Sequence, residues 1–512
     1  MLKKIIKGML IGGLILGLAG SAAAADYEVN IFGASAQFEY WIDGAPKFLD
    51  STDVDCDDAA IYHARGELDD RESGISICHY NTSILDDSGV AITARLTPGS
   101  TVYNDDVIIR YSTFASAEGL LAAREENPSN ADNPPCTSPD ERLMADEATT
   151  WFTLVTWENR EVLPGVFVKC PVELAEPDVF AGVKSHKCVD VTLGTADIDP
   201  ECFTQTTRGF DKWDHFDPND PEYSATWCKL GDPNKWTGTH ADWWTRIFTP
   251  NNPLPPTPWT GMDKENPFVV PFAFFRNNTS GKAVTEINNI TKAMGGMLFE
   301  GRVAKWNRFE HVDTDKKVML CIRHAGSGTH ATLQWSVMMP EYPNLVQNAK
   351  HPGATLQAAG FAPSVITNKG STDEIECVGF NGGLDSCAAQ SAHTWAAIGY
   401  ADADKLNGDL LAAGENCVDN CVEYSGSKGE SCRLCYEGYE ATYDNVKDCL
   451  YAFWGANAVY YQTVEVTAGG LADDLLAFSA VRANQCSHAG FWVPQDDMQC
   501  ERADCKSPII PK

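Results

Sequence analysis

Short apolar runs alternate with amphipathic stretches along much of the chain, which predicts β-strands connected by α-helices. The apolar runs predict strands at 27–32, 107–111, 189–194 and 318–322. A helix is predicted after the first strand, with Tyr40, Trp41, Ala45 and Phe48 on its apolar face. Further helices are predicted up to Ala123 and over 330–339, the latter ending before Pro340. This alternation predicts an α/β fold built on a largely parallel sheet.

Small or hydroxylated residues follow each predicted strand, in segments 33–38, 112–119, 194–197 and 323–329. In an open α/β sheet such turns gather at the carboxyl ends of the strands, where ligands bind. The last segment begins with Arg323 and contains Ser327, Gly328 and Thr329 just before a predicted helix. A helix start offers free backbone N–H groups, and the arginine adds a planar cation. This combination suits a tetrahedral oxyanion.

The N-terminal segment 1–25 has the pattern of a secretory signal peptide. Three lysines precede an apolar stretch from Met9 to Leu18, and the small residues Ala23–Ala25 would leave Asp26 as the first mature residue. The apolar stretch is too short for a stable membrane span. We therefore expect a periplasmic or extracellular protein without a membrane anchor.

Charge and cysteine content narrow the function further. Without the three signal lysines the chain carries 36 basic and 71 acidic residues, a formal charge of −35. This charge argues against binding nucleic acid, but not against a small anion in a buried site, since salt screens distant charges beyond roughly 10 Å. The 18 cysteines fit an oxidising compartment and predict disulfides whose pairing the spacing leaves open.

Polar and cysteine-bearing stretches interrupt the α/β pattern, and we interpret them as insertions near 124–188 and 211–265 and as a Cys-rich excursion over 414–450. The spacing of Cys417, Cys421, Cys432 and Cys435 could also form a zinc knuckle. Disulfides are favoured over zinc because thiolates do not stay reduced outside the cell.

Taken in order, the ligand-facing turns resemble those of the phosphate-binding proteins of ABC transporters, in the type II periplasmic-binding-protein superfamily. The resemblance runs through segments 33–38, 111–119, 193–198, 271–277, 297–306, 323–329 and 396–400. It implies a two-lobed fold with disulfide-rich insertions. One lobe would comprise 26–270 plus 400–512 and the other 271–399, with hinges near Pro271 and at 398–400.

The same resemblance implies a set of ligand-binding residues. These are Gln37, Phe38, Ser116, Asp197, Arg323, Ser327, Gly328 and Thr329. Phe38 and Ser116 would donate backbone N–H groups, Arg323 would bind ligand oxygens, and the segment 327–329 would close the site. Asp197 would accept the proton that phosphate carries and sulfate lacks. An unpaired carboxylate facing sulfate would cost several kcal/mol.

Plainer interpretations of these residues stay open. Asp197 could cap a helix, Ser116 could be an ordinary loop hydroxyl, and Arg323 could be a structural ion-pair partner. The chain also departs from the family pattern. Gln37 stands where a threonine is usual, and Ala325 stands where an aspartate is common. The nearby histidines His324 and His330 could make binding pH-sensitive, or they could be surface residues.

Three functions compete on this basis. The first is an exported solute-binding protein that captures phosphate or a related oxyanion for an ABC-type permease. The second is a disulfide-stapled extracellular interaction protein that keeps the fold with a degenerate site. An exported phosphatase is disfavoured, because no Ser/His/Asp arrangement or metal-binding carboxylate cluster stands out. We expect neither a cofactor nor a metal.

Overall fold

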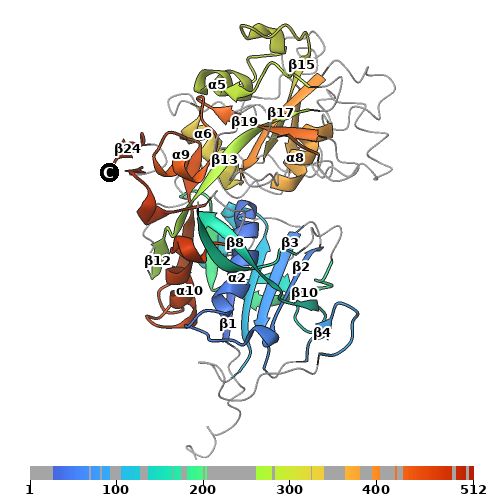
Figure 1. The fold of residues 1–512 in the computed structure, drawn as a ribbon, viewed down its shortest axis with the longest axis vertical. Helices are drawn as coiled ribbons and strands as arrows, with labels where there is room; N and C mark the ends of the chain where they lie inside the picture. The colour runs from blue at the N-terminus through green and yellow to red at the C-terminus, as the bar shows by residue number, and fades with distance from the viewer. Residues whose placement is uncertain are drawn as a thin grey trace, which may run out of the picture.

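The computed structural model shows two lobes joined by long strands (Figure 1). It describes residues 27–68, 71–80, 83–92, 105–126, 136–163, 165–174, 181–199, 202–203, 261–278, 283–323, 326–338, 364–368, 370–380, 395–403, 421–423, 430–486, 492–502 and 507–512. The predicted signal peptide lies outside these residues. So does most of the predicted insertion at 211–265.

Within the described residues, the first lobe is built on a nine-stranded sheet in the order β12-β21-β11-β1-β5-β3-β2-β7-β4. Its members are β1 Tyr27–Gly33, β2 Ile61–Leu68, β3 Arg71–Cys78, β4 Leu85–Asp86, β5 Val107–Thr113, β7 Trp151–Leu154, β11 Leu193–Ala196, β12 Met262–Glu265 and β21 Ala458–Gln462. The parallel strands β11, β1 and β5 lie together near its middle. Their carboxyl ends therefore meet at one edge of the sheet.

The second lobe holds another sheet of nine described strands, whose main order is β14-β19-β13-β17-β15-β16. These strands are β13 Phe268–Asn277, β14 Asn289–Ile290, β15 Lys317–Arg323, β16 Ser364–Asn368, β17 Trp395–Asp402 and β19 Glu430–Tyr436, with β18 Cys421–Glu423, β20 Trp454–Ala456 and β22 Val493–Pro494 beside them. Here β15 is parallel to both β16 and β17. Arg323, the last residue of β15, thus lies at a carboxyl edge of this sheet.

The α/β class is confirmed, but the expectation of a largely parallel sheet is wrong. In the first sheet β3 pairs antiparallel with both β2 and β5, and β21 pairs antiparallel with β11 and β12. The reason lies in the connections. The strands β2 and β3 are joined directly rather than through a helix, and a short connection reverses the strand direction.

Three segments assigned to insertions belong to the sheets instead. Residues 151–154, within the predicted insertion 124–188, form β7, which pairs with β2 in the first sheet. Residues 262–265 form β12, which pairs with β21 in the first sheet. Residues 430–436 form β19, which pairs with β13 in the second sheet rather than leaving the first lobe. The predicted strand at 189–194 is also two strands, because β10 (His186–Asp190) pairs with β6 (Glu141–Ala145) while β11 joins the main sheet.

The predicted helices form next to the strands that position them. They are α2 Phe38–Leu49, α3 Ser116–Ala123 and α6 Gly328–Ser336, and the structure also describes α5 Lys292–Phe299, α8 Ser371–Phe380, α9 Tyr443–Lys447 and α10 Leu471–Ser479. Helix α6 starts two residues earlier than predicted, because Ser327 caps it by accepting from the His330 N–H. None of the helices in the described part of the chain is both long and apolar enough to cross a membrane.

Disulfides tie the peripheral segments to the lobes. Those whose cysteines are both described are Cys56–Cys78, Cys136–Cys188, Cys170–Cys486, Cys321–Cys377 and Cys449–Cys500. Cys432 and Cys435 are disulfide-bonded as well, which confirms the preference for disulfides over zinc at these two positions. Cys417 lies outside the described residues.

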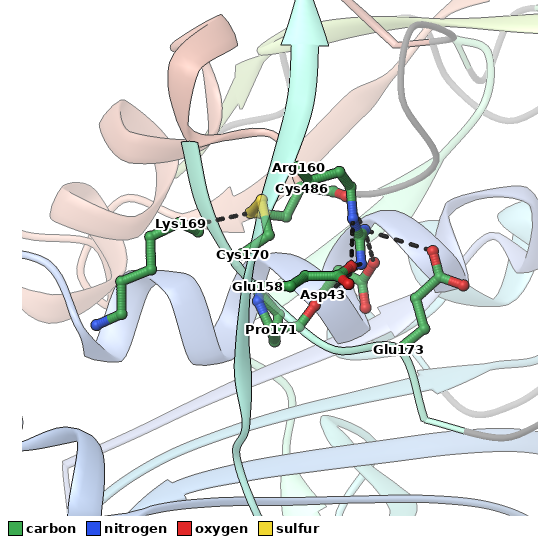
Figure 2. The surroundings of a disulfide bond; sticks show 8 residues. All are labelled: Asp43, Glu158, Arg160, Lys169, Cys170, Pro171, Glu173 and Cys486. Atoms are coloured by element: carbon green, nitrogen blue, oxygen red, sulfur yellow. Dashed lines mark hydrogen bonds and ion pairs between the residues drawn. A yellow bond between two sulfur atoms is a disulfide. The ribbon is translucent and has the colours of Figure 1, made fainter. Parts of the chain in front are cut away.

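The hairpin of β8 (Trp157–Leu163) and β9 (Val166–Pro171) covers α2 and is fastened there by a disulfide and a partly buried cation (Figure 2). Cys170 bonds to Cys486, 316 residues away, and Arg160 forms ion pairs with Asp43 of α2 at 3.1 Å and with Glu158 at 2.9 Å. A bond that closes so long a loop removes much entropy from the unfolded chain. The disulfide holds the hairpin in place, and the ion pair to Asp43 attaches the hairpin to α2, which begins at Phe38.

Glycine brings α3 against the first sheet. A Cβ on Gly119 would lie 2.4 Å from the Thr195 carbonyl oxygen and 2.7 Å from that of Phe32. Both obstacles are backbone atoms of central strands, which cannot move aside. Only glycine lets the start of α3 approach the end of β11 this closely.

We predict that Gly119→Ala lowers the free energy of unfolding by about 3 kcal/mol, because overpacking at rigid backbone costs roughly that much. Gly296→Ala is the matched control. It lies within α5 with no atom within 4 Å of its Cβ position, so alanine should be neutral or stabilise by up to about 1 kcal/mol. Urea unfolding of both variants measures the difference. Equal stability of the two variants would contradict the packing argument.

Candidate functional site

The carboxylate of Asp197, directly after β11, is the meeting point of side chains from both lobes. Its Oδ2 accepts from the hydroxyls of Ser116 at 3.2 Å and Thr329 at 3.4 Å, and its Oδ1 accepts from Gln37 Nε2 at 3.2 Å. Asp197 is buried, with 2% of its surface exposed. Ser116 and Gln37 belong to the first lobe and Thr329 to α6 of the second, so this carboxylate links the two.

Ser116, the first residue of α3, makes a second contact between the lobes. Its hydroxyl oxygen accepts from the backbone N–H groups of Gly328 at 3.2 Å and Asp197 at 3.3 Å. A Cβ on Gly328 would lie only 2.4 Å from that oxygen. In addition, the N–H of Ala117 donates to the Gly326 carbonyl at 3.3 Å. The starts of α3 and α6, which belong to different lobes, are therefore in direct contact.

The amide of Gln37 has a defined orientation. Its Oε1 accepts from the indole Nε1 of Trp41 at 3.1 Å, and an indole nitrogen can only donate. The Nε2 group must therefore face the opposite way, where it donates both to Asp197 and to Oδ1 of Asn457 at 2.7 Å. Gln37 thus presents a donor at the position where a threonine hydroxyl was expected.

Arg323 also reaches across the two lobes. One terminal nitrogen donates to the hydroxyl of Ser371 at 2.7 Å, and the other donates to Ser35 of the first lobe at 3.2 Å. The guanidinium is buried, and its charge lowers the pKa values of both Asp197 and His330. A cation, a carboxylate and several hydroxyls are thus gathered in one dry place.

Burial raises the pKa of Asp197 to about 6, and the charge of Asp402 adds to the rise. Hydrogen bonds from Gln37 and Ser116 and the charge of Arg323 act in the opposite direction but do not cancel it. The carboxylate is therefore mostly ionised at pH 7 and becomes protonated within the mildly acidic range.

His330 lies behind the site rather than on the surface, with 1% of its surface exposed. Burial and the charge of Arg323 lower the pKa of His330 to about 3, so it stays neutral near pH 7. The Tyr400 hydroxyl accepts from the backbone N–H of Arg323 at 3.0 Å and is also hydrogen-bonded to His330 Nδ1. The two sequence interpretations, a pH sensor or a surface residue, are both wrong for His330. His324 lies outside the described residues.

Most of the predicted site residues come together. Gln37, Ser116, Asp197, Arg323, Gly328 and Thr329 are buried in one network of hydrogen bonds. Asp197 accepts from three side chains, so the helix-cap interpretation is wrong. Ser116 is the first residue of a helix rather than a loop residue.

Two predicted roles are not available in this arrangement. The Phe38 N–H donates to the Ser35 carbonyl in the 3₁₀ turn Ser35–Gln37. The Phe38 ring packs instead under the Arg65 guanidinium, 5.0 Å from its centroid. The Ser327 hydroxyl accepts from the His330 N–H as a helix cap. Both residues shape the site, and their polar groups are already engaged.

Three further residues contact the site without having been predicted from the sequence: Ser371, Ser35 and Asn457. Ser371 follows strand β16 at the start of α8, so the strand–turn–helix pattern used for the other segments could have found it. Ser35 lies within segment 33–38, but it is not one of the residues that the family resemblance implies. Asn457 stands alone between alanines in the sequence, and nothing local marks it.

The described residues offer little for a metal. One group of Cys136, Glu141 and Cys188 has ligand atoms within 4.8 Å of one another. The two cysteines form a disulfide, however, and a disulfide sulfur is not a thiolate ligand. This group is therefore part of the covalent framework.

Comparison with known proteins gives a likeness of fold. No family model and no curated protein matches the chain. Among solved structures 21 chains match. They include an ABC-type phosphate transport receptor from Vibrio cholerae, which is 12% identical with a TM-score of 0.25 over 44% of this chain and 68% of the receptor. A phosphate binding protein from Stenotrophomonas maltophilia is 11% identical, with a TM-score of 0.24 over 54% and 65%.

A DING protein is also similar, at 11% identity and a TM-score of 0.32 over 60% of this chain and 78% of that protein. At these identities and TM-scores, the neighbours carry no functional weight. The function must therefore be inferred from the contacts within the site.

The ionisation of Asp197 should be visible in the stability of the protein. Its pKa is about 6 in the folded state and 3.8 without burial, so the stabilisation present below pH 3.8 is lost as the pH rises to 6. The whole effect amounts to about 3 kcal/mol, since a tenfold change in proton affinity is worth about 1.4 kcal/mol. Relative to Asp197→Asn, which cannot ionise, the ligand-free protein should lose stability between pH 4 and pH 7. Urea unfolding at both values tests this; a constant difference would contradict it.

Proposed function

We propose that this protein is an exported solute-binding protein that captures inorganic phosphate, or a related tetrahedral oxyanion, between its two lobes. The observation that carries the proposal is the contact of Asp197 with donors from both lobes, next to the buried cation of Arg323. A buried cation surrounded by hydroxyls and by two helix starts suits an anion with several oxygens.

Each residue has a proposed role in this function. Arg323 binds two ligand oxygens through its terminal nitrogens, which now donate to Ser371 and Ser35. Ser116 and Thr329 turn their hydroxyls from Asp197 to the ligand. The backbone N–H groups at the start of α6 provide further donors, aided by the helix dipole.

Asp197 provides the discrimination. As a carboxylate it only accepts hydrogen bonds, so a bound phosphate satisfies it by donating its own proton. Sulfate near pH 7 has no such proton and would face the carboxylate unpaired. The cost of that repulsion favours phosphate by several kcal/mol.

Binding is coupled to closure of the lobes, because the donors to the ligand come from both lobes. Ser116, Gly328, Thr329 and Arg323 form contacts between the lobes, so separation of the lobes would take the donors apart. A ligand that bridges these groups binds the closed state more tightly and shifts the equilibrium towards it. The resemblance in sequence adds an ABC-type permease as the receiver of the ligand and the N-terminal segment as the export signal.

A second function has support of its own. The hydroxyls of Ser116 and Thr329 and the amide of Gln37 all donate to Asp197, so the carboxylate already occupies donors that an anion would use. An extracellular interaction protein with a degenerate site would keep this arrangement permanently. It would stay folded and indifferent to phosphate.

Calorimetric titration separates the two. We predict that the wild-type protein binds phosphate at pH 7.5 and that Arg323→Gln weakens binding on the order of 100-fold, since charge-assisted hydrogen bonds contribute about 1.5–3 kcal/mol each. Arg302→Gln is the control, because its side chain is 64% exposed on the same lobe. Absence of heat with phosphate, sulfate and arsenate would end the proposal and favour the interaction protein.

Discrimination between anions should depend on pH. Because the pKa of Asp197 is about 6, the carboxylate repels sulfate at pH 7.5, whereas below pH 6 the protonated group can donate to it. Sulfate affinity should therefore rise by up to tenfold for each unit that the pH falls from 7.5 to 6, and should level off below pH 6. Asp197→Asn should bind sulfate equally at both values. A sulfate affinity that ignores pH in the wild type would remove Asp197 from this role.

A further inference from the structure

Asn457 lies where the chain passes from one lobe to the other. It separates β20, which pairs with β13 of the second sheet, from β21, which pairs with β11 and β12 of the first. Another passage runs from β12 to β13. Asn457 joins the two passages, since its N–H donates to the Phe268 carbonyl at 2.9 Å and its carbonyl accepts from the Asn266 amide at 2.5 Å.

The side chain of Asn457 extends from this passage into the site. Its Oδ1 accepts from Gln37 Nε2 at 2.7 Å, the shorter of the two hydrogen bonds made by that nitrogen. Trp41 fixes the opposite end of the Gln37 amide. Gln37 is therefore held by both neighbours with one N–H directed at Asp197.

The orientation of the Asn457 amide follows from the same network. Gln37 presents a donor, so the atom of Asn457 that faces it must be the oxygen, and Nδ2 must point elsewhere. Asn457 is fully buried, and Nδ2 has no hydrogen-bond partner in the described part of the chain. A half-satisfied buried amide destabilises the fold. A residue that only stabilised the fold would not need that cost.

We infer that Asn457 is a positioning residue that holds the Gln37 amide on Asp197 and thereby makes anion recognition depend on the hinge. The inference rests on the proposed function. Asn457 itself touches neither Asp197 nor a ligand in this scheme; it acts through Gln37. When the hinge moves, the passage carrying Asn457 moves relative to α2, and the donor to Asp197 is released. When the lobes close, the donor returns.

A double-mutant cycle on the full-length chain tests the coupling, with inorganic phosphate as the titrant at pH 7.5. Gln37→Ala and Asn457→Ala should each weaken binding about tenfold, the value of one hydrogen bond to a charged group. The double variant should lose about tenfold as well, instead of about 100-fold, because both changes remove the same donor.

Two further variants keep the inference falsifiable. Asn457→Asp retains an oxygen acceptor for Gln37, so Gln37→Ala should still cost about tenfold in that background, which also serves if Asn457→Ala does not fold. Asn266→Ala removes the bond between the two passages but leaves Gln37 in place, and should change the affinity by less than about threefold. A structural role alone would make Asn266→Ala as damaging as Asn457→Ala.

A pH profile adds a measure that general destabilisation would not move. Because the Gln37 hydrogen bond lowers the pKa of Asp197, Asn457→Ala should move the midpoint of the sulfate response to higher pH. Additive losses in the cycle or an unmoved midpoint would overturn the inference while the proposed function stands. Wild-type protein that gives no heat with phosphate would overturn the proposed function first.

Discussion

The structure depends on a buried carboxylate that receives donors from two lobes. Asp197 collects hydrogen bonds from Ser116 and Gln37 on one side and from Thr329 on the other. A charge in such a dry place is costly, as the pKa of about 6 records, and it persists because donors and the charge of Arg323 compensate it. The hydrogen bonds that stabilise the buried Asp197 carboxylate therefore also hold the two lobes together.

Backbone packing makes that contact geometrically accessible. Gly119 lets α3 approach the ends of β1 and β11, and Gly328 lets the start of α6 approach Ser116. A methyl group at either position would separate the groups by more than a hydrogen bond tolerates. The disulfide from Cys170 to Cys486 fixes the hairpin over α2, which begins beside Gln37. The disulfide and the two glycine contacts therefore all help to position the polar groups around Asp197.

Gln37 and Asn457 connect Asp197 to the passage between the two sheets. Gln37 provides the donor expected from a threonine hydroxyl, but a longer amide has more freedom and needs to be held. Trp41 and Asn457 hold it from opposite ends. Gln37 thus depends on partners elsewhere in the chain, one of them on a passage between the sheets.

Much of this was determined by the sequence alone. The apolar runs predicted β1, β5 and β15, and the small residues at the strand ends marked the segments that contain Ser116, Asp197, Arg323 and Thr329, because strand ends and helix starts are local features. The resemblance to a known family was needed to single out the individual residues. The pairing of β12 and β19, the engaged N–H of Phe38 and the buried place of His330 were decided by the tertiary structure. So was the contact between Asn457 and Gln37, which lie 420 residues apart in the sequence. Such contacts depend on which surfaces the fold brings together, and no local pattern encodes them.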